Sequence, residues 1–291
     1  MTHMFCFGLG YSAGRLARRL VQKGWRVSGT VRTEDKRARL AQDGFEGHIF
    51  DGTKPIEGFA KLAGEITHIL LSAPPGPEGD PVYDCHAGDI AALAPRLQWA
   101  GYLSTTGVYG DRQGGWVDET SELMPATERG RRRVAAEAAW QGLQATDGLP
   151  LHIFRLAGIY GPGSNQLLSV LNGKSRRVVK PGQVFSRIHV DDIASILEAS
   201  IDQPNPGRVY NVCDDEAAPP QDVVAYAAEL LGRPAPPEVA FEEADMSPMG
   251  RSFYAESKRV ANARIKQELG VELAYPSYRD GLTALLETVA K

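Results

Sequence analysis

The sequence predicts an α/β fold, a doubly wound parallel sheet with a smaller, mostly helical C-terminal domain that binds substrate. Three observations support this prediction. Predicted strands and helices alternate over the first half of the chain, a glycine-rich turn joins the first strand to the first helix, and the regular alternation stops near Gly163. Alternating strands and helices are joined by right-handed crossovers, which make neighbouring strands parallel.

The first turn carries the clearest pattern. An apolar run at Phe5–Phe7 predicts a buried strand, and a helix with apolar residues at helical spacing begins near Ser12. Between them the glycines match G-x-G-x-x-G/A, in which the first glycine makes the turn and the second lets a pyrophosphate approach the backbone. The N–H groups at the start of the helix would face the phosphates. We therefore expect a Rossmann-type domain whose cofactor site includes Gly8, Gly10, Tyr11, Ser12 and Ala13.

The next strand determines which dinucleotide is expected. It covers Trp25–Val31 and ends at Arg32, about twenty residues beyond the glycines, where the residue that faces the adenosine ribose is expected. An acidic residue there suits the 2′-hydroxyl of NAD, whereas a guanidinium suits a 2′-phosphate, so the sequence favours NADP over NAD. The alternative is a solvated arginine in the polar run that ends at Arg39.

Four further predicted strands continue the alternation. A helix through Ala41 precedes a strand at Gly47–Phe50, after which Asp51 either accepts a hydrogen bond from the adenine amino group or begins a turn. The helix Ile56–Leu62 leads to a doubly buried strand that ends at Ser72 and Ala73, before a proline-rich run typical of the ligand-binding edge of such sheets. The remaining elements of this half are a helix at Asp84–Gln98, a strand at Gly101–Ser104, a helix at Thr127–Trp140 and a strand at Leu151–Leu156.

After Gly163 the predicted elements are shorter. They are a helix at Gln166–Leu171, a strand at Ser186–Val190, a helix at Ile193–Ile201 and a strand at Val209–Val212, followed by mostly helical residues 217–291. We expect residues 1–162 and 187–213 to form the dinucleotide-binding domain and residues 163–186 and 214–291 to form the substrate-binding part.

Composition excludes several classes of function. The 291 residues are 43% hydrophobic with a formal charge of −4, which leaves no basic footprint for nucleic acid. No apolar segment is long enough to cross a bilayer and no signal peptide is evident, so we expect a cytoplasmic protein without a membrane partner. The three scattered cysteines argue against a disulfide framework and against a metal site.

Several motifs together resemble the extended short-chain dehydrogenase/reductase superfamily, the relatives of the NAD-dependent epimerases and dehydratases of nucleotide sugars. They are GLGYSAG near the start, YLSTTGVYGD, RLAGIYGPG, RIHVDDIA and YNVCDDE, in this order along nearly the whole chain. The resemblance implies NAD or NADP binding and a small-molecule substrate, either a nucleotide sugar or another carbonyl or hydroxyl compound. It also implies pairing of two chains into a homodimer.

The chain departs from this family at the pair that transfers the proton. Where the family has Tyr-x-x-x-Lys, this sequence has Arg129 and Arg133, so it is most similar to atypical members without the pair. Because arginine does not lose its proton in proteins, Arg129 cannot act as a general acid or base. Arg133 could still hold the nicotinamide ribose as a fixed cation, or the arginines could form a solvated helix face.

The family's catalytic hydroxyl is retained. Thr105 stands where the family has Ser or Thr, and Tyr109 is the nearest other phenol. The cations Arg129 and Arg187 are also available to orient a substrate, and His189 is expected in a structural turn. The resulting hypothesis is an NAD(P)-dependent oxidoreductase or epimerase with a non-standard acid/base residue. The alternative is an NADP-binding redox sensor or regulatory protein that has lost catalysis.

Overall fold

The computed structural model describes residues 2–173 and 175–289 and confirms the predicted α/β class. The chain forms two compact units. Unit 1 comprises Met1–Ser104, Arg131–Arg155 and Ile193–Tyr210, and unit 2 comprises Thr105–Gly130, Leu156–Asp192 and Asn211–Lys291. This division differs from the expected domain bounds, which also included Lys174 and residues 290–291, outside the described residues. Residues 105–130 cluster with unit 2 because they bond to its later segments: Lys258, for example, donates to the carbonyl of Gly110.

A single large sheet organises unit 1. Within the described residues its seven strands follow the order β11-β7-β5-β4-β1-β2-β3, and the pairs β2–β3, β1–β2, β1–β4 and β4–β5 are parallel. The order reverses between β1 and β4, and in such sheets ligands bind beyond the carboxyl ends of the strands at this point. The strands are β1 (His3–Phe7), β2 (Arg26–Val31), β3 (Glu46–Ile49), β4 (His68–Leu71), β5 (Trp99–Thr105), β7 (Leu151–Leu156) and β11 (Val209–Val212).

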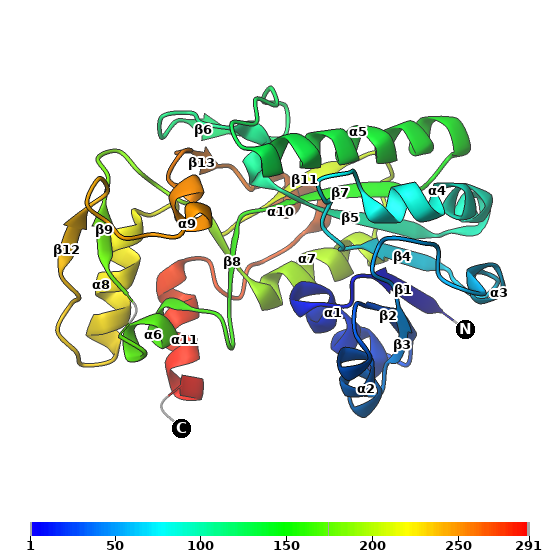
Figure 1. The fold of residues 1–291 in the computed structure, drawn as a ribbon, viewed down its shortest axis with the longest axis horizontal. Helices are drawn as coiled ribbons and strands as arrows, with labels where there is room; N and C mark the ends of the chain where they lie inside the picture. The colour runs from blue at the N-terminus through cyan, green and yellow to red at the C-terminus, as the bar shows by residue number, and fades with distance from the viewer. Residues whose placement is uncertain (1, 174, 290–291) are drawn as a thin grey trace. The chain divides into compact units, whose positions relative to one another are not determined.

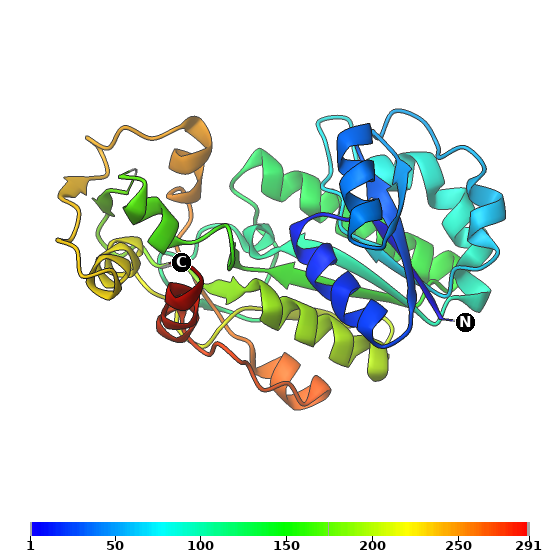
Figure 2. The same ribbon diagram turned by 90° about the horizontal axis from the view of Figure 1, so that it is seen from below.

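Helices cover both faces of this sheet. Helices α1 (Tyr11–Gln22) and α7 (Val190–Asp202) lie on one face, and α4 (Pro81–Leu93) and α5 (Glu128–Asp147) lie on the other (Figures 1 and 2). The second face buries a large apolar cluster that includes Phe7, Tyr102 and Trp140, each at 0% exposure, because strands covered on both sides carry nearly unbroken hydrophobic runs. The shorter elements of this unit are α2 (Glu34–Gln42), α3 (Phe59–Ala63) and the 3₁₀ turn η1 (Ala94–Arg96).

A buried ion pair fixes α5 to the sheet. Arg155 on β7 donates to both carboxylate oxygens of Glu137 on α5, with an Nη2–Oε2 distance of 2.7 Å, and both side chains are at most 5% exposed. The hydroxyl of Ser104 donates to the same carboxylate. Because breaking such a pair leaves an uncompensated buried charge, this contact holds α5 and the end of β5 in one position.

Unit 2 consists of short parallel pairs and a small helical core. The pairs are β8 (Gly158–Tyr160) with β10 (Arg187–His189), β9 (Arg177–Val179) with β12 (Glu238–Ala240), and β6 (Trp116–Val117) with β13 (Arg259–Val260). Helices α6 (Gln166–Leu171), α8 (Pro220–Leu230) and α11 (Tyr278–Val289) pack around Leu167, Ala227 and Leu282. The remaining elements are the 3₁₀ turn η2 (Thr106–Tyr109), α9 (Pro248–Phe253) and α10 (Ala263–Leu269).

Most predicted elements are present, and the differences in their bounds have local causes. The bounds of β7, α6 and β11 are confirmed as predicted. The helix expected from Ile56 begins at Phe59, because Gly58 before it has φ +71° and interrupts the helical backbone. The helix expected from Asp84 begins at Pro81, because Asp80 caps it by accepting from the N–H groups of Val82 and Tyr83.

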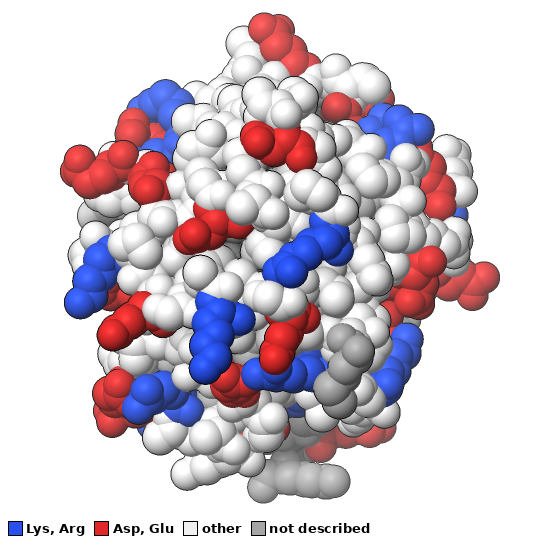
Figure 3. Space-filling model, turned by 90° about the vertical axis from the view of Figure 1, so that its right-hand side faces the viewer, with Lys and Arg blue, Asp and Glu red and all other residues white. Residues whose placement is uncertain are grey.

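The surface carries charges of both signs. On the face shown in Figure 3, Lys and Arg alternate with Asp and Glu, and neither sign forms a continuous area. Among the described helices, none combines the length and the apolar character that a membrane span requires. The same part of the chain holds no group of three His, Cys, Asp or Glu residues placed to bind a metal ion.

Candidate functional site

The turn after β1 brings two strand ends into close contact. Gly8 has φ +92°, and a Cβ at this position would lie 2.8 Å from the backbone nitrogen of Ala73. The N–H groups of Ser72 and Ala73 both donate to the carbonyl of Phe7 at 2.8 Å, and the N–H of Gly8 donates to Thr30 Oγ1 at 2.7 Å. Only glycine fits this backbone without strain, so the first glycine of the motif is required by packing as well as by the turn.

The backbone N–H groups at the start of α1 have no side-chain cap. Its N-cap is Gly10, which has no side chain to accept from the N–H groups of the first turn, and nothing lies within 4 Å of the position its Cβ would occupy. Ser12 and Ala13 are buried at 8% and 0% exposure and hold the helix close to the sheet. First-turn N–H groups and the positive end of the helix dipole favour a phosphate at this place. The predicted residues from Gly8 to Ala13 therefore form one cradle.

Two predicted adenosine contacts lie just beyond β2 and β3. Arg32 follows the last residue of β2 and is exposed, and among the described residues its side chain has no hydrogen bond or ion pair. Asp51 is exposed, and its Oδ1 accepts from the N–H and the hydroxyl of Thr53. These hydrogen bonds hold the pKa of Asp51 below its usual range. Asp51 thus begins a turn, as one alternative predicted, while its Oδ2 accepts no bond in the described structure.

Arg133, which was expected at the family's lysine position, is hydrogen-bonded to the sheet. Arg133 Nη1 donates to the Tyr102 hydroxyl at 3.0 Å and to the Leu103 carbonyl at 2.6 Å, and the guanidinium lies 5.5 Å from the centre of the Tyr102 ring. Burial raises the pKa of Tyr102, which therefore stays neutral. Arg133 is a positioned cation rather than a solvated one.

In unit 2, η2 holds the two predicted catalytic hydroxyls differently. Thr105 is half-buried, and its Oγ1 accepts from the N–H of Gly107 at 3.1 Å, which leaves its own proton without a partner in the described structure. Tyr109 is completely buried, and its hydroxyl donates to Asn211 Oδ1 at 2.7 Å. Arg129 is exposed and lies 4.8 Å above the ring of Phe253.

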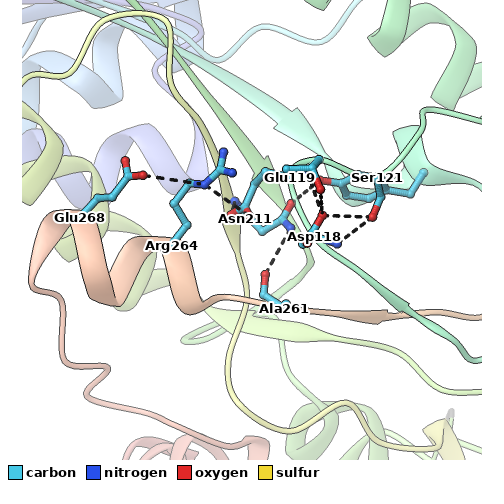
Figure 4. Close-up of polar contacts among 9 residues, drawn as sticks. Asp118, Glu119, Ser121, Asn211, Ala261, Arg264 and Glu268 are labelled. Carbon is cyan, nitrogen blue, oxygen red and sulfur yellow. Dashed lines mark hydrogen bonds and ion pairs between the residues drawn. The ribbon is translucent and has the colours of Figure 1, made fainter.

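The partner of Tyr109 belongs to a polar network that the sequence analysis missed (Figure 4). Glu119 Oε1 accepts from the backbone N–H of Asn211 at 2.8 Å, and the Asn211 amide donates to the carbonyl of Ala261. Arg264 lies 3.7 Å from Glu119 Oε2, on its other side. The network fixes Tyr109 from three distant segments. No local pattern in the sequence could have shown this.

His189 has the structural role that was expected. It is 1% exposed, its Nδ1 accepts from the N–H of Asp191 at 3.2 Å, and its ring centre lies 4.0 Å from that of Tyr275. Through these contacts, the His189 ring packs in the interior of unit 2.

Asp214 is a buried carboxyl group of unit 2, with 3% of its surface exposed. Burial raises the pKa of Asp214 to about 8, although the nearby charge of Arg187 and backbone hydrogen bonds from Glu216 and Arg187 lower it. The sequence predicted no role for this residue.

The sequence of this chain is similar to that of known proteins. Residues 90–213 match the model of the NAD dependent epimerase/dehydratase family. Protein YeeZ of Escherichia coli K12 is 30% identical over 285 residues, which cover 95% of this chain and 97% of YeeZ. The chain belongs to the NAD-dependent epimerase/dehydratase family.

Solved structures agree with this family. A functionally unknown conserved protein from Silicibacter pomeroyi is 52% identical, with a TM-score of 0.91 and all of both chains covered. The UDP-glucuronic acid 4-epimerase from Bacillus cereus, solved in complex with NAD, is 17% identical with a TM-score of 0.77 over all of both chains, which shows a shared fold. The family model and YeeZ confirm the resemblance of this chain to the epimerase/dehydratase family, and solved structures that share its fold include complexes with NAD.

Substitutions of the two glycines of the cradle should have different effects on folding and on cofactor binding. We expect Gly8→Ala to lower the free energy of unfolding by about 1–3 kcal/mol, because its Cβ would meet the Ala73 backbone at a positive φ. Gly10→Ala should change stability by under about 1 kcal/mol but weaken dinucleotide binding by about tenfold, since the methyl group occupies the approach to the helix start. Urea denaturation and calorimetry measure the two effects. Equal loss of stability in both variants would contradict this assignment.

Asp214 should make stability depend on pH. Its folded pKa of about 8 lies above the value near 4 of an unfolded aspartate, so the folded state holds an extra proton and this contribution to stability is lost as pH rises from about 4 to about 8. Thermal denaturation from pH 5 to pH 8.5 should show Asp214→Asn gaining about 1–3 kcal/mol relative to the parent over this range. Asp215→Asn, an exposed neighbour with the same charge change, should show no such gain.

Proposed function

We propose that this protein is an oxidoreductase or epimerase of the extended short-chain dehydrogenase class that uses NADP in preference to NAD. The observation that carries the cofactor preference is Arg32, an exposed cation directly after β2 with no partner among the described residues. A guanidinium there can donate two charge-assisted hydrogen bonds to a 2′-phosphate. It has no acceptor atom for the proton of a 2′-hydroxyl. The proposal departs from the NAD named in the Bacillus cereus epimerase complex.

The cradle of unit 1 fits a dinucleotide. Main-chain N–H groups of the first turn of α1, from Tyr11 onward, and the dipole of this helix suit a pyrophosphate, and Ser72 and Ala73 lie beside Gly8 at the end of β4. Asp51 Oδ2 is available to the adenine amino group, and Arg133 would hold the nicotinamide ribose as a fixed cation. When bound, the nicotinamide would supply hydride transfer, so the chain need only orient it and provide a proton donor.

The acid/base residue is proposed to be non-standard. Arg129 stands at the tyrosine position of the family and cannot release a proton near neutral pH. Thr105 keeps a free hydroxyl proton and is the first candidate to contact the substrate oxygen. Tyr109 could serve only after exchanging its bond to Asn211. A substrate of the carbonyl or hydroxyl class, including nucleotide sugars, fits this set of groups.

The cofactor preference is tested at Arg32. We expect Arg32→Glu to weaken NADP binding relative to NAD by about 1–3 kcal/mol, because a charge-assisted contact is lost and a repulsive carboxylate is gained. Calorimetry with both dinucleotides measures the ratio. Arg39→Glu, an exposed substitution on α2, the helix that follows Arg32, should leave the ratio unchanged. Identical titration curves for parent and Arg32→Glu would refute the role.

A measurement of NADPH turnover distinguishes an enzyme from a redox sensor. In the presence of a panel of carbonyl compounds and nucleotide sugars, we expect the protein to oxidise NADPH, which is measured as a loss of NADPH absorbance. Thr105→Ala should lower kcat by about 10²-fold and leave the affinity for NADPH unchanged. Thr106→Ala is the matched control. Tight NADPH binding without any turnover would favour the regulatory protein instead.

A further inference from the structure

We propose that residues 242–253 of unit 2 form a lid over η2, and that Arg129 latches this lid by stacking on Phe253 of α9. The inference goes beyond the proposed function, and it rests on that function only in taking Thr105 as the hydroxyl that the lid covers. Opening and closing of the lid require neither cofactor nor turnover, so they can be measured on the protein alone.

The two ends of the lid are held together. Phe241, just before it, stacks on Tyr254, just after it, with 5.2 Å between the ring centres. Tyr254 also packs edge-on against Phe185 at 5.4 Å, and Lys180 donates to the Tyr254 carbonyl. Both ends are therefore anchored within unit 2. The residues between them form a surface loop whose ends are close, a geometry that is frequent in functional loops.

Between its ends, the lid is mostly exposed. Within it Ala244 is buried, but α9 has no buried residue, and Met249 and Phe253 are 62% and 46% exposed. Arg251 contacts the lid itself and its base: its Nη2 donates to the Ala244 carbonyl at 3.0 Å, and its guanidinium lies 4.8 Å from the Phe241 ring. Because so short a helix is unstable in water without packing, α9 needs a further contact to persist.

Arg129 supplies such a contact from another segment of unit 2. Its guanidinium lies 4.8 Å from the centre of the Phe253 ring, within the range of a cation–π interaction. Both side chains are exposed, and a cation–π contact between exposed groups is weak. A weak contact suits a latch, because the open and closed states then interconvert readily.

The backbone at Arg129 packs directly against η2. The next residue, Gly130, is buried, and a Cβ there would lie 2.8 Å from the carbonyl oxygen of Gly107. The N–H of Gly130 donates to Thr127 Oγ1 at 3.1 Å, which holds this turn in place. Gly107 in turn donates its N–H to Thr105 Oγ1. A lid that closes onto Arg129 therefore approaches the turn that carries the proposed catalytic hydroxyl.

The latch also gives a role to an arginine at a position where the family resemblance predicts tyrosine. A guanidinium is planar, keeps its charge and stacks on aromatic faces, so Arg129 can hold the Phe253 ring although it cannot exchange a proton. Loops that close over a reacting group exclude water and can control product release. Arg129 would thus act on access to η2 rather than on proton transfer.

The first measurement is hydrogen exchange of the full chain, followed by mass spectrometry of peptides that cover α9. Opening of the lid should break the hydrogen bonds of α9, so its amide groups exchange faster. We expect Phe253→Ala and Arg129→Ala each to raise the exchange rate about two- to fivefold, the factor that corresponds to one exposed cation–π contact. Arg129→Lys keeps a cation and should stay closer to the parent. Met249→Ala, at an exposed apolar residue of the same helix, should leave the rate unchanged.

The second measurement tests whether the lid covers η2. Thr105→Cys introduces a thiol at the position of the hydroxyl, and its reaction with N-ethylmaleimide is followed by mass spectrometry of the peptide that contains it. The natural cysteines lie far from this position in the sequence and are read in other peptides. Adding Phe253→Ala should raise the reaction rate of the introduced thiol about two- to fivefold, whereas adding Met249→Ala should not.

Two results would overturn the proposal. Unchanged exchange of α9 in both Phe253→Ala and Arg129→Ala would refute the latch, and faster exchange with unchanged reactivity of the introduced thiol would refute the lid. Circular dichroism checks that the variants fold. NADPH titration of the same samples keeps the two proposals apart, because neither measurement of the lid involves the cofactor. Intact NADPH binding with unaltered exchange refutes only the lid, and absent NADPH binding with the expected exchange refutes only the cofactor assignment.

Discussion

The close approach of Gly8 to the backbone of Ala73 is the constraint on which the rest of unit 1 depends. It lets the ends of β1 and β4 meet where the strand order reverses, and it directs the chain into α1 with Gly10 as a bare N-cap. The carbonyl of Phe7 then accepts two N–H groups from the β4 end. Any larger residue at Gly8 would bring its Cβ against the backbone of Ala73 and force the strand ends apart. The absence of a side chain at Gly8 thus allows both the packing of the sheet and the turn into α1.

Arg129 and Arg133, which the sequence analysis expects at the positions of the Tyr-x-x-x-Lys pair, have different environments in the structure. Arg133 is fixed against Tyr102 and Leu103, so a positive charge is kept in place although the residue type has changed. Arg129 stacks on Phe253 at the surface of unit 2. In the proposed function, the fixed cation Arg133 binds the cofactor and a hydroxyl group elsewhere transfers the proton. The proposal thus assigns binding and proton transfer to different residues.

Two buried polar features of unit 2 differ in how they affect stability. Tyr109, Asn211 and Glu119 form a network of hydrogen bonds in which each group has a partner, as expected for a structural core. Asp214 lies three residues beyond Asn211, and burial raises the pKa of its carboxyl group to about 8. Because ionising a buried carboxyl group costs stability, Asp214 makes the stability of this unit depend on pH.

The sequence by itself determined the class of fold, the glycine cradle and the arginine after β2, because each depends on local features: unbroken apolar runs, backbone freedom at Gly8, and residue type at Arg32. Tertiary structure alone decided the rest. The division between the units, the burial of Tyr109 against Asn211, the attachment of Arg133 to β5 and the meeting of Arg187 with Asp214 all join segments far apart in the chain. Hydrogen bonds and burial between distant segments leave no periodic trace in a sequence, so only the folded chain reveals which polar groups are satisfied and which remain free to bind.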